Sequence, residues 1–210
     1  MYTLTFTLTA PTMRFSAQQT YNNKPTLPYP TKSAVIGLVA ASLGRRRGED
    51  IDDLANMRMG VAVLNKPHTF TDFQTMGYAN MTQTARMPIQ RKQYLSDCKF
   101  QIALENNNEN LLESIARSFT NPAFPLFCGA RDCIVTEPIS GTINEGTIED
   151  NIGRGIETYI ETNISASYTP DTTIVYDQPT GRREFRARCV KHTENDADDI
   201  TAMVASVQTE

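Results

Sequence analysis

The chain has 210 residues, a formal net charge of −4 and a hydrophobic share of 40%, enough for one large domain or two small ones with a sizeable core. No apolar run reaches the ~18 residues that a membrane span requires, and the net acidity argues against a protein that coats nucleic acid indiscriminately. The charge is uneven: residues 1–133 hold 14 basic and 10 acidic side chains, whereas residues 134–210 hold 6 and 14. This asymmetry fits an anionic ligand that only the front half binds.

The four cysteines form no C-x-x-C pair, and no histidine lies near enough in the sequence to suggest a zinc module. We therefore expect reduced, buried thiols, no metal site and no cofactor. The N-terminus shows no basic region followed by an apolar stretch, so no signal peptide is expected. These features favour a cytoplasmic protein with no membrane contact.

Alternation of apolar residues with threonines predicts a strand over residues 2–9, because a period of two is typical of a half-buried strand. Pro11 is expected to end it. Residues 11–30 contain four prolines separated by polar and aromatic residues, which is typical of a long loop. We expect the first strand to expose its threonines on the open face of a sheet.

Residues 30–47 carry the strongest helix signal in the sequence, because apolar residues recur on one face. Thr31 or Ser33 can cap the start, and Gly44 can adopt the left-handed conformation that ends a helix. Lys32 stands beside the free N–H groups of the first turn, where a phosphate can bind. Three cations follow the helix, namely Arg45, Arg46 and Arg47. The alternative is a core helix with solvated ends.

The other expected elements of the front half are a short helix at 49–57, a strand at 59–64, a strand at 98–104, a helix at 111–119 and a short strand at 134–135. Residues 67–93 are polar and rich in Met and Thr, so we expect a protruding hairpin or loop that a partner orders. The order βαββαβ predicts an α+β fold of the ferredoxin-like, RRM-like type over residues 1–139.

Residues 140–210 are predicted to form a smaller, β-rich region with an acidic tail. Residues 140–165 show few clear elements, whereas residues 172–176 and 185–190 are short strand candidates. Residues 182–188 make a basic patch within this acidic half.

Three basic patches in the front half form the candidate site. They are Arg45 to Arg47, then Arg86, Arg91 and Lys92 with Tyr94, and finally Arg131 on a turn at Gly129. Arginine and lysine supply phosphate contacts, and tyrosine can stack on a base. The alternative interpretation of each basic patch, taken alone, is a charged surface that keeps the protein soluble. His68 and His192 are the general acid–base candidates, but nothing places either beside a nucleophile, and no Walker-type loop or dinucleotide fingerprint is present.

Several segments, taken in order from Leu4 to about Ile139, resemble one known family. They include Tyr29-Pro30-Thr31-Lys32-Ser33, Thr71-Asp72-Phe73-Gln74-Thr75, Gln93-Tyr94-Leu95-Ser96-Asp97-Cys98, and Asn121-Pro122 followed by Pro125-Leu126-Phe127-Cys128-Gly129. A weaker match returns at residues 176–179 and 183–185. The order and spacing resemble CasD, the fifth-numbered Cas protein family of the RAMP superfamily, a subunit of type I-E CRISPR Cascade complexes.

The resemblance implies a ferredoxin-like RAMP domain whose β-hairpin thumb is residues 67–95. It implies a non-catalytic subunit that binds the 5′ handle of the CRISPR RNA, caps the backbone filament and touches the backbone and large subunits, in support of antiviral defence. Target DNA would be read by guide pairing, so its contact with this chain would be indirect. The expected RNA-binding set is Lys32, Ser33, Arg45, Arg46, Arg47, Arg86, Arg91, Lys92, Tyr94, Gly129 and Arg131.

The chain departs from the family pattern at three places. The family usually has Met-Gln-x-Trp-Gly after its first strand, where this chain has Arg14 and no Trp. Ala130 and Asp132 replace an arginine and a serine at the Gly turn, which leaves Arg131 to make that contact alone. Gln74 stands where the thumb usually carries a histidine.

Two alternatives remain open. Relatives in type I-C systems are metal-independent endoribonucleases that process precursor CRISPR RNA. Such cleavage needs a base within hydrogen-bond reach of a ribose 2′-OH, so the missing thumb histidine argues against it. A free single-strand RNA-binding module is the third hypothesis.

Overall fold

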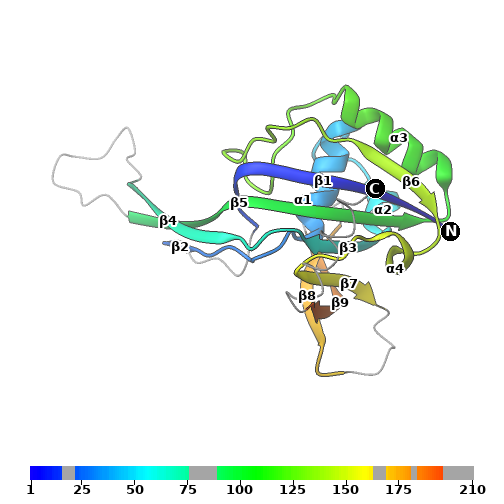
Figure 1. The fold of residues 1–210 in the computed structure, drawn as a ribbon. Helices are drawn as coiled ribbons and strands as arrows, with labels where there is room; N and C mark the ends of the chain where they lie inside the picture. The colour runs from blue at the N-terminus through cyan, green and yellow to red at the C-terminus, as the bar shows by residue number, and fades with distance from the viewer. Residues whose placement is uncertain (16–21, 76–88, 163–168, 181–183, 196–210) are drawn as a thin grey trace, which may run out of the picture.

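The computed structural model describes residues 1–15, 22–75, 89–162, 169–180 and 184–195. Within this part of the chain, a mixed, mostly antiparallel sheet carries a few helices (Figure 1). The strands are β1 (Tyr2–Met13), β2 (Asn23–Lys24), β3 (Arg58–Val63), β4 (His68–Thr75), β5 (Ile89–Asn106), β6 (Gly141–Glu145), β7 (Glu157–Thr162), β8 (Thr172–Pro179) and β9 (Phe185–Glu194). The helices are α1 (Lys32–Ser42), α2 (Asp52–Ala55), α3 (Glu109–Thr120) and α4 (Ile148–Asn151).

The strands lie in the order β6-β1-β5-β3-β7-β9-β8, and β2 and β4 pair with β5 outside this path. The expected succession of strand, helix, strand, strand, helix and strand is present, but its last strand was predicted at the wrong place. That strand is β6, which pairs with β1, whereas Ile134 makes an isolated bridge with Phe127. The boundary predicted between residues 139 and 140 therefore does not separate two sheets.

Helices α1 and α3 cover one face of the central strands, and the hydrophobic core lies between these helices and the sheet. Leu4, Phe6 and Leu8 of β1 are buried there as predicted, and the Phe6 ring lies 4.9 Å from that of Phe119 on α3. Burying such side chains stabilises the fold by about 1.5–3 kcal/mol each. All four cysteines are also buried.

The opposite face of β1 is covered, which contradicts the expected open threonine face. Thr3 and Thr5 are both buried, and the Thr3 hydroxyl donates to the carbonyl of Gly146 at 3.0 Å. Nearby, the amide of Gly153 donates to the side chain of Gln101 at 2.6 Å. The segment from β6 to β7, where the sequence showed few clear elements, provides this cover. The first half of this threonine face is therefore closed to RNA, whereas Thr7 and Thr9 further along β1 are half-buried.

Helix α1 begins and ends as predicted. The Thr31 side chain accepts a hydrogen bond from the Ala34 amide at 3.3 Å, and Gly44 has a left-handed φ of +80°. Strand β1 continues through Pro11 to Met13, because a proline at this position still fits extended backbone. No helix in the described residues is long and apolar enough to cross a membrane.

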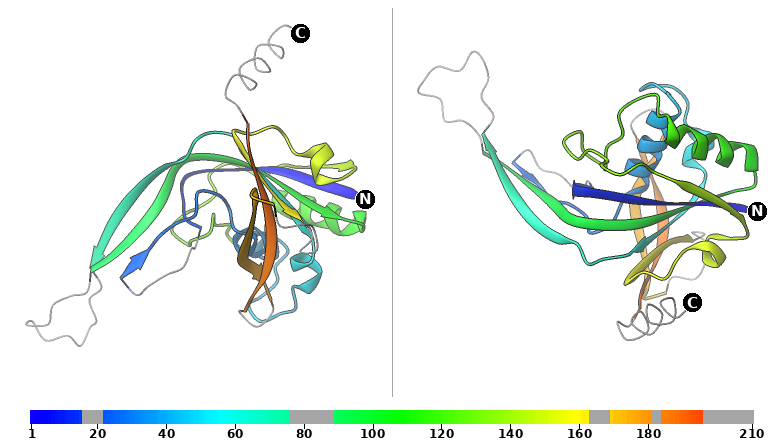
Figure 2. Two further views of the ribbon diagram at one scale, coloured as in Figure 1. Left: turned by 90° about the horizontal axis from the view of Figure 1, so that it is seen from below. Right: turned by 45° about the horizontal axis from the view of Figure 1, so that its top comes forward.

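The predicted protruding hairpin is present. Strand β4 pairs with the first half of β5, from His68 opposite Ser96 to Thr75 opposite Ile89, and the pair extends away from the body (Figures 1 and 2). The second half of β5 lies between β1 and β3 in the body. We call the part formed by β4 and residues 89–96 the thumb.

Candidate nucleic-acid interface

The thumb presents its two described cations on opposite faces. Arg91 lies opposite Phe73 and Lys92 lies opposite Asp72 in the β4–β5 ladder, and consecutive residues of a strand point to opposite sides. We call the side with Arg91 and Phe73 the outer face. The side with Lys92 and Tyr94, which continues into the helix-covered core, is the inner face. The sequence had grouped these cations with Tyr94 as one patch, and the strand separates them.

The outer face carries an exposed aromatic ring with a cation over it. The Phe73 side chain is 63% exposed, and the Arg91 guanidinium carbon lies 5.6 Å from its ring centroid. An aromatic ring beside an arginine can stack on a base and contact the adjoining phosphate. Phe73 was absent from the predicted site, although an apolar residue within a polar hairpin was a signal for it.

Tyr94 on the inner face is buried and does not present a free ring. It stacks on Phe70 at 5.4 Å, and the Arg14 guanidinium carbon lies 5.8 Å from its centroid. Its hydroxyl donates to an Asp132 carboxylate oxygen at 2.5 Å. Burial and this bond raise the pKa of Tyr94, so the hydroxyl stays protonated. Tyr94 therefore joins the thumb to the turn at Asp132, and its ring is not free for the base stacking that the sequence suggested.

The turn that carries Arg131 depends on a glycine. Gly129 has a φ of +84°, and a Cβ there would lie 2.1 Å from the backbone oxygen of Arg14. The Arg14 amide donates to the Cys128 carbonyl at 3.2 Å, which holds this turn against the end of β1. Gly129 therefore acts by allowing the close approach, and Arg131 beside it is exposed.

We expect Gly129→Ala to destabilise the protein clearly more than Gly48→Ala. Both glycines have positive φ, which costs other residues about 1–2 kcal/mol. A Cβ at Gly48 would meet nothing within 4 Å, whereas one at Gly129 would overlap backbone. Urea denaturation followed by circular dichroism compares the two variants. Equal losses would contradict the importance of this close approach.

A groove gathers most of the other predicted residues. It has a volume of about 820 Å³ and lies between α1, the segment that follows it, residues 124–131 and the β8–β9 pair. The predicted residues that line it are Ser33, Arg45, Arg46, Arg47 and Arg131. Arg45 forms a two-pronged ion pair with Asp53, and this bond raises the pKa of Arg45. Arg46 and Arg47 are exposed, and neither has an ion pair within the described part of the chain.

Lys32 was predicted to contact RNA, but it is buried and already paired. Its ammonium lies 2.8 Å from a Glu161 carboxylate oxygen, and its backbone amide donates to Asp177 at 2.7 Å. Burial lowers the pKa of Lys32, while Glu161 opposes that shift. The site at the N-terminus of α1 where an anion could bind is therefore occupied by the carboxylate of Asp177. The Ser33 hydroxyl lies within hydrogen-bond distance of that of Thr31, at 3.2 Å.

The residues considered for catalysis do not converge. His68 begins β4 and His192 lies on β9, in separate parts of the sheet. The Gln74 side chain donates to Asp72 at 2.6 Å. Arg86 lies outside the described residues. Within those residues, no group of three or more His, Cys, Asp or Glu side chains is arranged to hold a metal ion.

Comparisons with known proteins agree with one another. A family model described as "CRISPR-associated protein (Cas_Cas5)" matches residues 3–193. A solved structure described as "Crystal structure of Cas protein" is 31% identical with a TM-score of 0.67, over 91% of this chain and 94% of that one. Another, described as "CRISPR RNA-guided surveillance complex", is 18% identical with a TM-score of 0.71, over 92% and 90%. Its likeness concerns the fold. No curated protein matches the chain.

Proposed function

Because this chain belongs to the CRISPR-associated Cas5 family, we propose that it is a subunit of a type I-E CRISPR Cascade surveillance complex. In this proposal it holds the 5′ handle of the CRISPR RNA and caps the backbone filament, in contact with the backbone and large subunits. The unit from β1 to β6 would be the ferredoxin-like RAMP core, with α1 and α3 on one face. Target DNA would be recognised by the guide, and this cytoplasmic chain would touch it indirectly.

The observation that carries the proposal is the outer face of the thumb. Phe73 and Arg91 are exposed on a hairpin that projects from the body, and neither packs in the core. A single exposed ring is normal on a protein surface, so the contact surface is indicated by the ring of Phe73 together with the cation over it. An aromatic ring and a cation together match the base and phosphate of single-stranded RNA. Arg131, on a turn bonded to the inner face, is a further exposed cation near the thumb base.

The proposal is tested by producing the chain together with a CRISPR array and the proteins encoded beside its gene. The RNA that co-purifies with the tagged chain is extracted and sequenced from its 5′ end. We expect each molecule to begin with the same repeat-derived segment. A complex without RNA, or with RNA of unrelated 5′ ends, would contradict handle binding.

The proposal treats the chain as non-catalytic, and metal-independent cleavage is the competing function. Gln74 replaces the thumb histidine of the family pattern, and its amide is engaged with Asp72. We expect purified protein, incubated with repeat RNA in EDTA, to leave the RNA intact while binding it. Cleavage at one position in the repeat would instead assign an endoribonuclease of the type I-C kind.

A further inference from the structure

The thumb leaves the body at an irregular point of β5. Asp97 has a left-handed φ of +54°, which is uncommon for any residue other than glycine, and the register between β1 and β5 is interrupted there. Beyond Leu95, the described part of the thumb pairs with the rest of the chain only through the two-residue strand β2. A two-stranded hairpin has little stability of its own, so the direction of the thumb depends on side-chain contacts at its base.

One side-chain hydrogen bond ties the thumb to the turn formed by residues 128–133. The Tyr94 hydroxyl donates to Asp132 at 2.5 Å, and no other hydrogen bond among the described residues joins these two parts. The turn is fixed to the body, because the Cys128 carbonyl accepts a hydrogen bond from the Arg14 amide at 3.2 Å. The Tyr94 bond therefore connects a projecting hairpin to a fixed part of the body.

The charges around this bond keep it formed. Burial and the bond itself raise the pKa of Tyr94, so its hydroxyl keeps the proton that it donates. Partial burial of Asp132 opposes ionisation, but the bond from Tyr94 and the charges of Arg14 and Lys92 lower the pKa of Asp132 overall. A protonated hydroxyl facing an ionised carboxylate makes a charge-assisted hydrogen bond, which is stronger than a neutral one.

The same arrangement leaves a neighbouring charge without a partner. The Nε and Nη1 atoms of Arg14 are buried, and neither has a hydrogen-bond partner within the described part of the chain. A buried donor left unpaired costs about 1–3 kcal/mol, and a carboxylate that turned to Arg14 would remove this cost. Asp132 instead binds Tyr94. Stability alone does not explain this choice, and such conflicts are expected at functional sites.

The bond lies between two surfaces that are proposed to contact RNA. On the thumb, Phe73 and Arg91 are exposed on the outer face. On the turn, the exposed Arg131 directly precedes Asp132. Two contacts on one ligand reinforce each other only when their separation fits the ligand, and fixing that separation in advance reduces the ordering cost of binding. A tie between the thumb and the turn fixes such a separation.

We infer that Tyr94 and Asp132 are positioning residues for RNA binding: their hydrogen bond holds the outer face of the thumb and Arg131 at the separation at which one RNA strand contacts both. The inference rests on the proposed function and deepens it, because neither residue needs to touch the RNA. It gives Tyr94 a role that differs from base stacking.

The test is a double-mutant cycle on the affinity of the whole chain for the 5′-handle RNA. Tyr94→Phe removes the hydroxyl and keeps the ring beside Phe70. Arg131→Ala is then measured with and without Tyr94→Phe. We expect Arg131→Ala to lower the affinity about threefold less when the hydroxyl is absent, a coupling of the size found for residues that share one network. A residue that only stabilises the fold would give additive effects.

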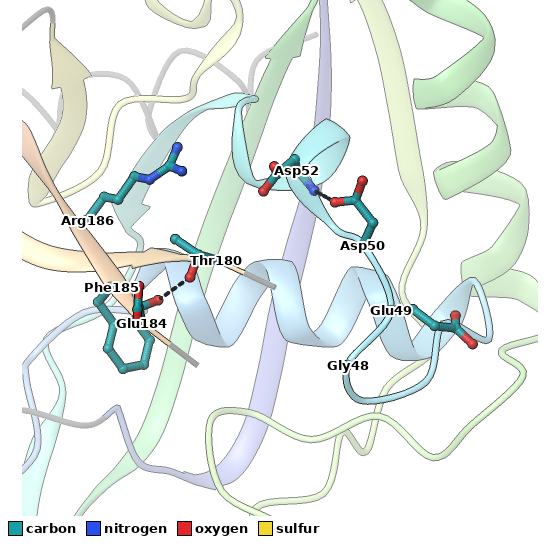
Figure 3. Close-up of a pocket in the computed structure, with 8 residues that line it drawn as sticks. All are labelled: Gly48, Glu49, Asp50, Asp52, Thr180, Glu184, Phe185 and Arg186. Atoms are coloured by element: carbon teal, nitrogen blue, oxygen red, sulfur yellow. Dashed lines mark hydrogen bonds between the residues drawn. The ribbon is translucent and has the colours of Figure 1, made fainter. Parts of the chain in front are cut away.

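Two controls are matched to these variants. Tyr159→Phe also removes a hydroxyl that donates to a carboxylate, that of Glu157 on β7. Arg186→Ala removes an exposed cation from β9, which two strands separate from β5; it lines a pocket beside the segment that follows α1 (Figure 3). Tyr159→Phe should leave the cost of Arg131→Ala unchanged, and Arg186→Ala should show no coupling to Tyr94→Phe.

A pair of variants at Asp132 separates the hydrogen bond from the charge. Asp132→Asn keeps an oxygen that can accept from Tyr94 and should keep the coupling, whereas Asp132→Ala should abolish it, although both remove the same charge. Loss of coupling in both would assign the effect to the charge and overturn the inference. Asp132→Ala also replaces Tyr94→Phe in the cycle if circular dichroism shows that the latter does not fold.

The remaining outcomes are distinct. Equal costs of Arg131→Ala with and without the Tyr94 hydroxyl would overturn the positioning role, and so would an equal coupling from Tyr159→Phe. If the wild-type chain does not bind the RNA, the proposed function fails and the inference fails with it. If the chain binds the RNA and the variants are additive, only the positioning role is refuted.

Discussion

Replacing Asp177 with alanine is expected to lower the free energy of unfolding by about 3–5 kcal/mol, because removing one partner of a buried ion pair leaves the other charge uncompensated. Asp177 accepts hydrogen bonds from Arg188 at 2.5 and 2.9 Å, and it caps α1 through the Lys32 amide. The side chains of Arg188 and Asp177 are 3% and 6% exposed. The variant would leave the buried Arg188 guanidinium with only the longer contact to Glu161, at 3.9 Å, and would remove the acceptor of the Lys32 amide.

Urea denaturation of the whole chain, followed by circular dichroism, measures this loss. Glu113→Ala is the matched control, because Glu113 pairs with Arg117 on the exposed side of α3. Exposed pairs of this kind contribute about 0.3–0.5 kcal/mol. If both variants lose equally little, the buried network does not hold the β8–β9 pair against α1.

RNA binding is expected to fall most in a variant that neutralises both faces of the thumb, Arg91→Ala with Lys92→Ala. Each phosphate contact to a single strand contributes a slope of about −0.7 to the dependence of log affinity on log salt. RNA that crosses the outer face loses the contact with Arg91, so the slope should become shallower by about 0.7, and a change of about 1.4 would mean that Lys92 on the inner face contacts a phosphate as well. Titration of a 5′-handle RNA at several salt concentrations measures this change.

The single variants assign the face that the RNA crosses. We expect Arg91→Ala to account for most of the loss, because Arg91 shares the outer face with the exposed ring of Phe73. Phe73→Ala should weaken binding by a further 1–3 kcal/mol, about the contribution of one stacked base. Lys99→Ala is the control, since this exposed cation lies on β5 within the body. If Lys92→Ala weakens binding more than Arg91→Ala does, the RNA crosses the inner face instead.

Features with a local physical cause could be predicted from the sequence. The alternation in β1, the cap at Thr31 and the left-handed Gly44 each depend on residues that are close in sequence. The thumb could be predicted because polar residues interrupt an otherwise apolar pattern. The placement of Arg91 and Lys92 on opposite faces could also be predicted, because consecutive residues of a strand point to opposite sides.

The features that could not be predicted depend on partners that are distant in sequence. Lys32 looked like a phosphate ligand because its partners, Glu161 and Asp177, lie 129 and 145 residues away. Tyr94 looked like a stacking residue because Asp132 lies 38 residues further on. No local pattern predicts such a pairing, since either residue alone would be a normal surface group.

Because the thumb and the body share strand β5, this strand limits how the thumb can change in length. Strand β5 keeps one register with β1 from Asn106 to Leu95, interrupted at Asp97, which has a left-handed φ of +54°, and it continues into the thumb. Side chains alternate along the strand, so Arg91 on the outer face and the core residue Ile102 point to opposite sides. Inserting one residue between them would turn the thumb over and present Lys92 where Arg91 now stands. A change of two residues per strand therefore keeps the two faces of the thumb in place, whereas a change of one residue keeps them only where a β-bulge absorbs it.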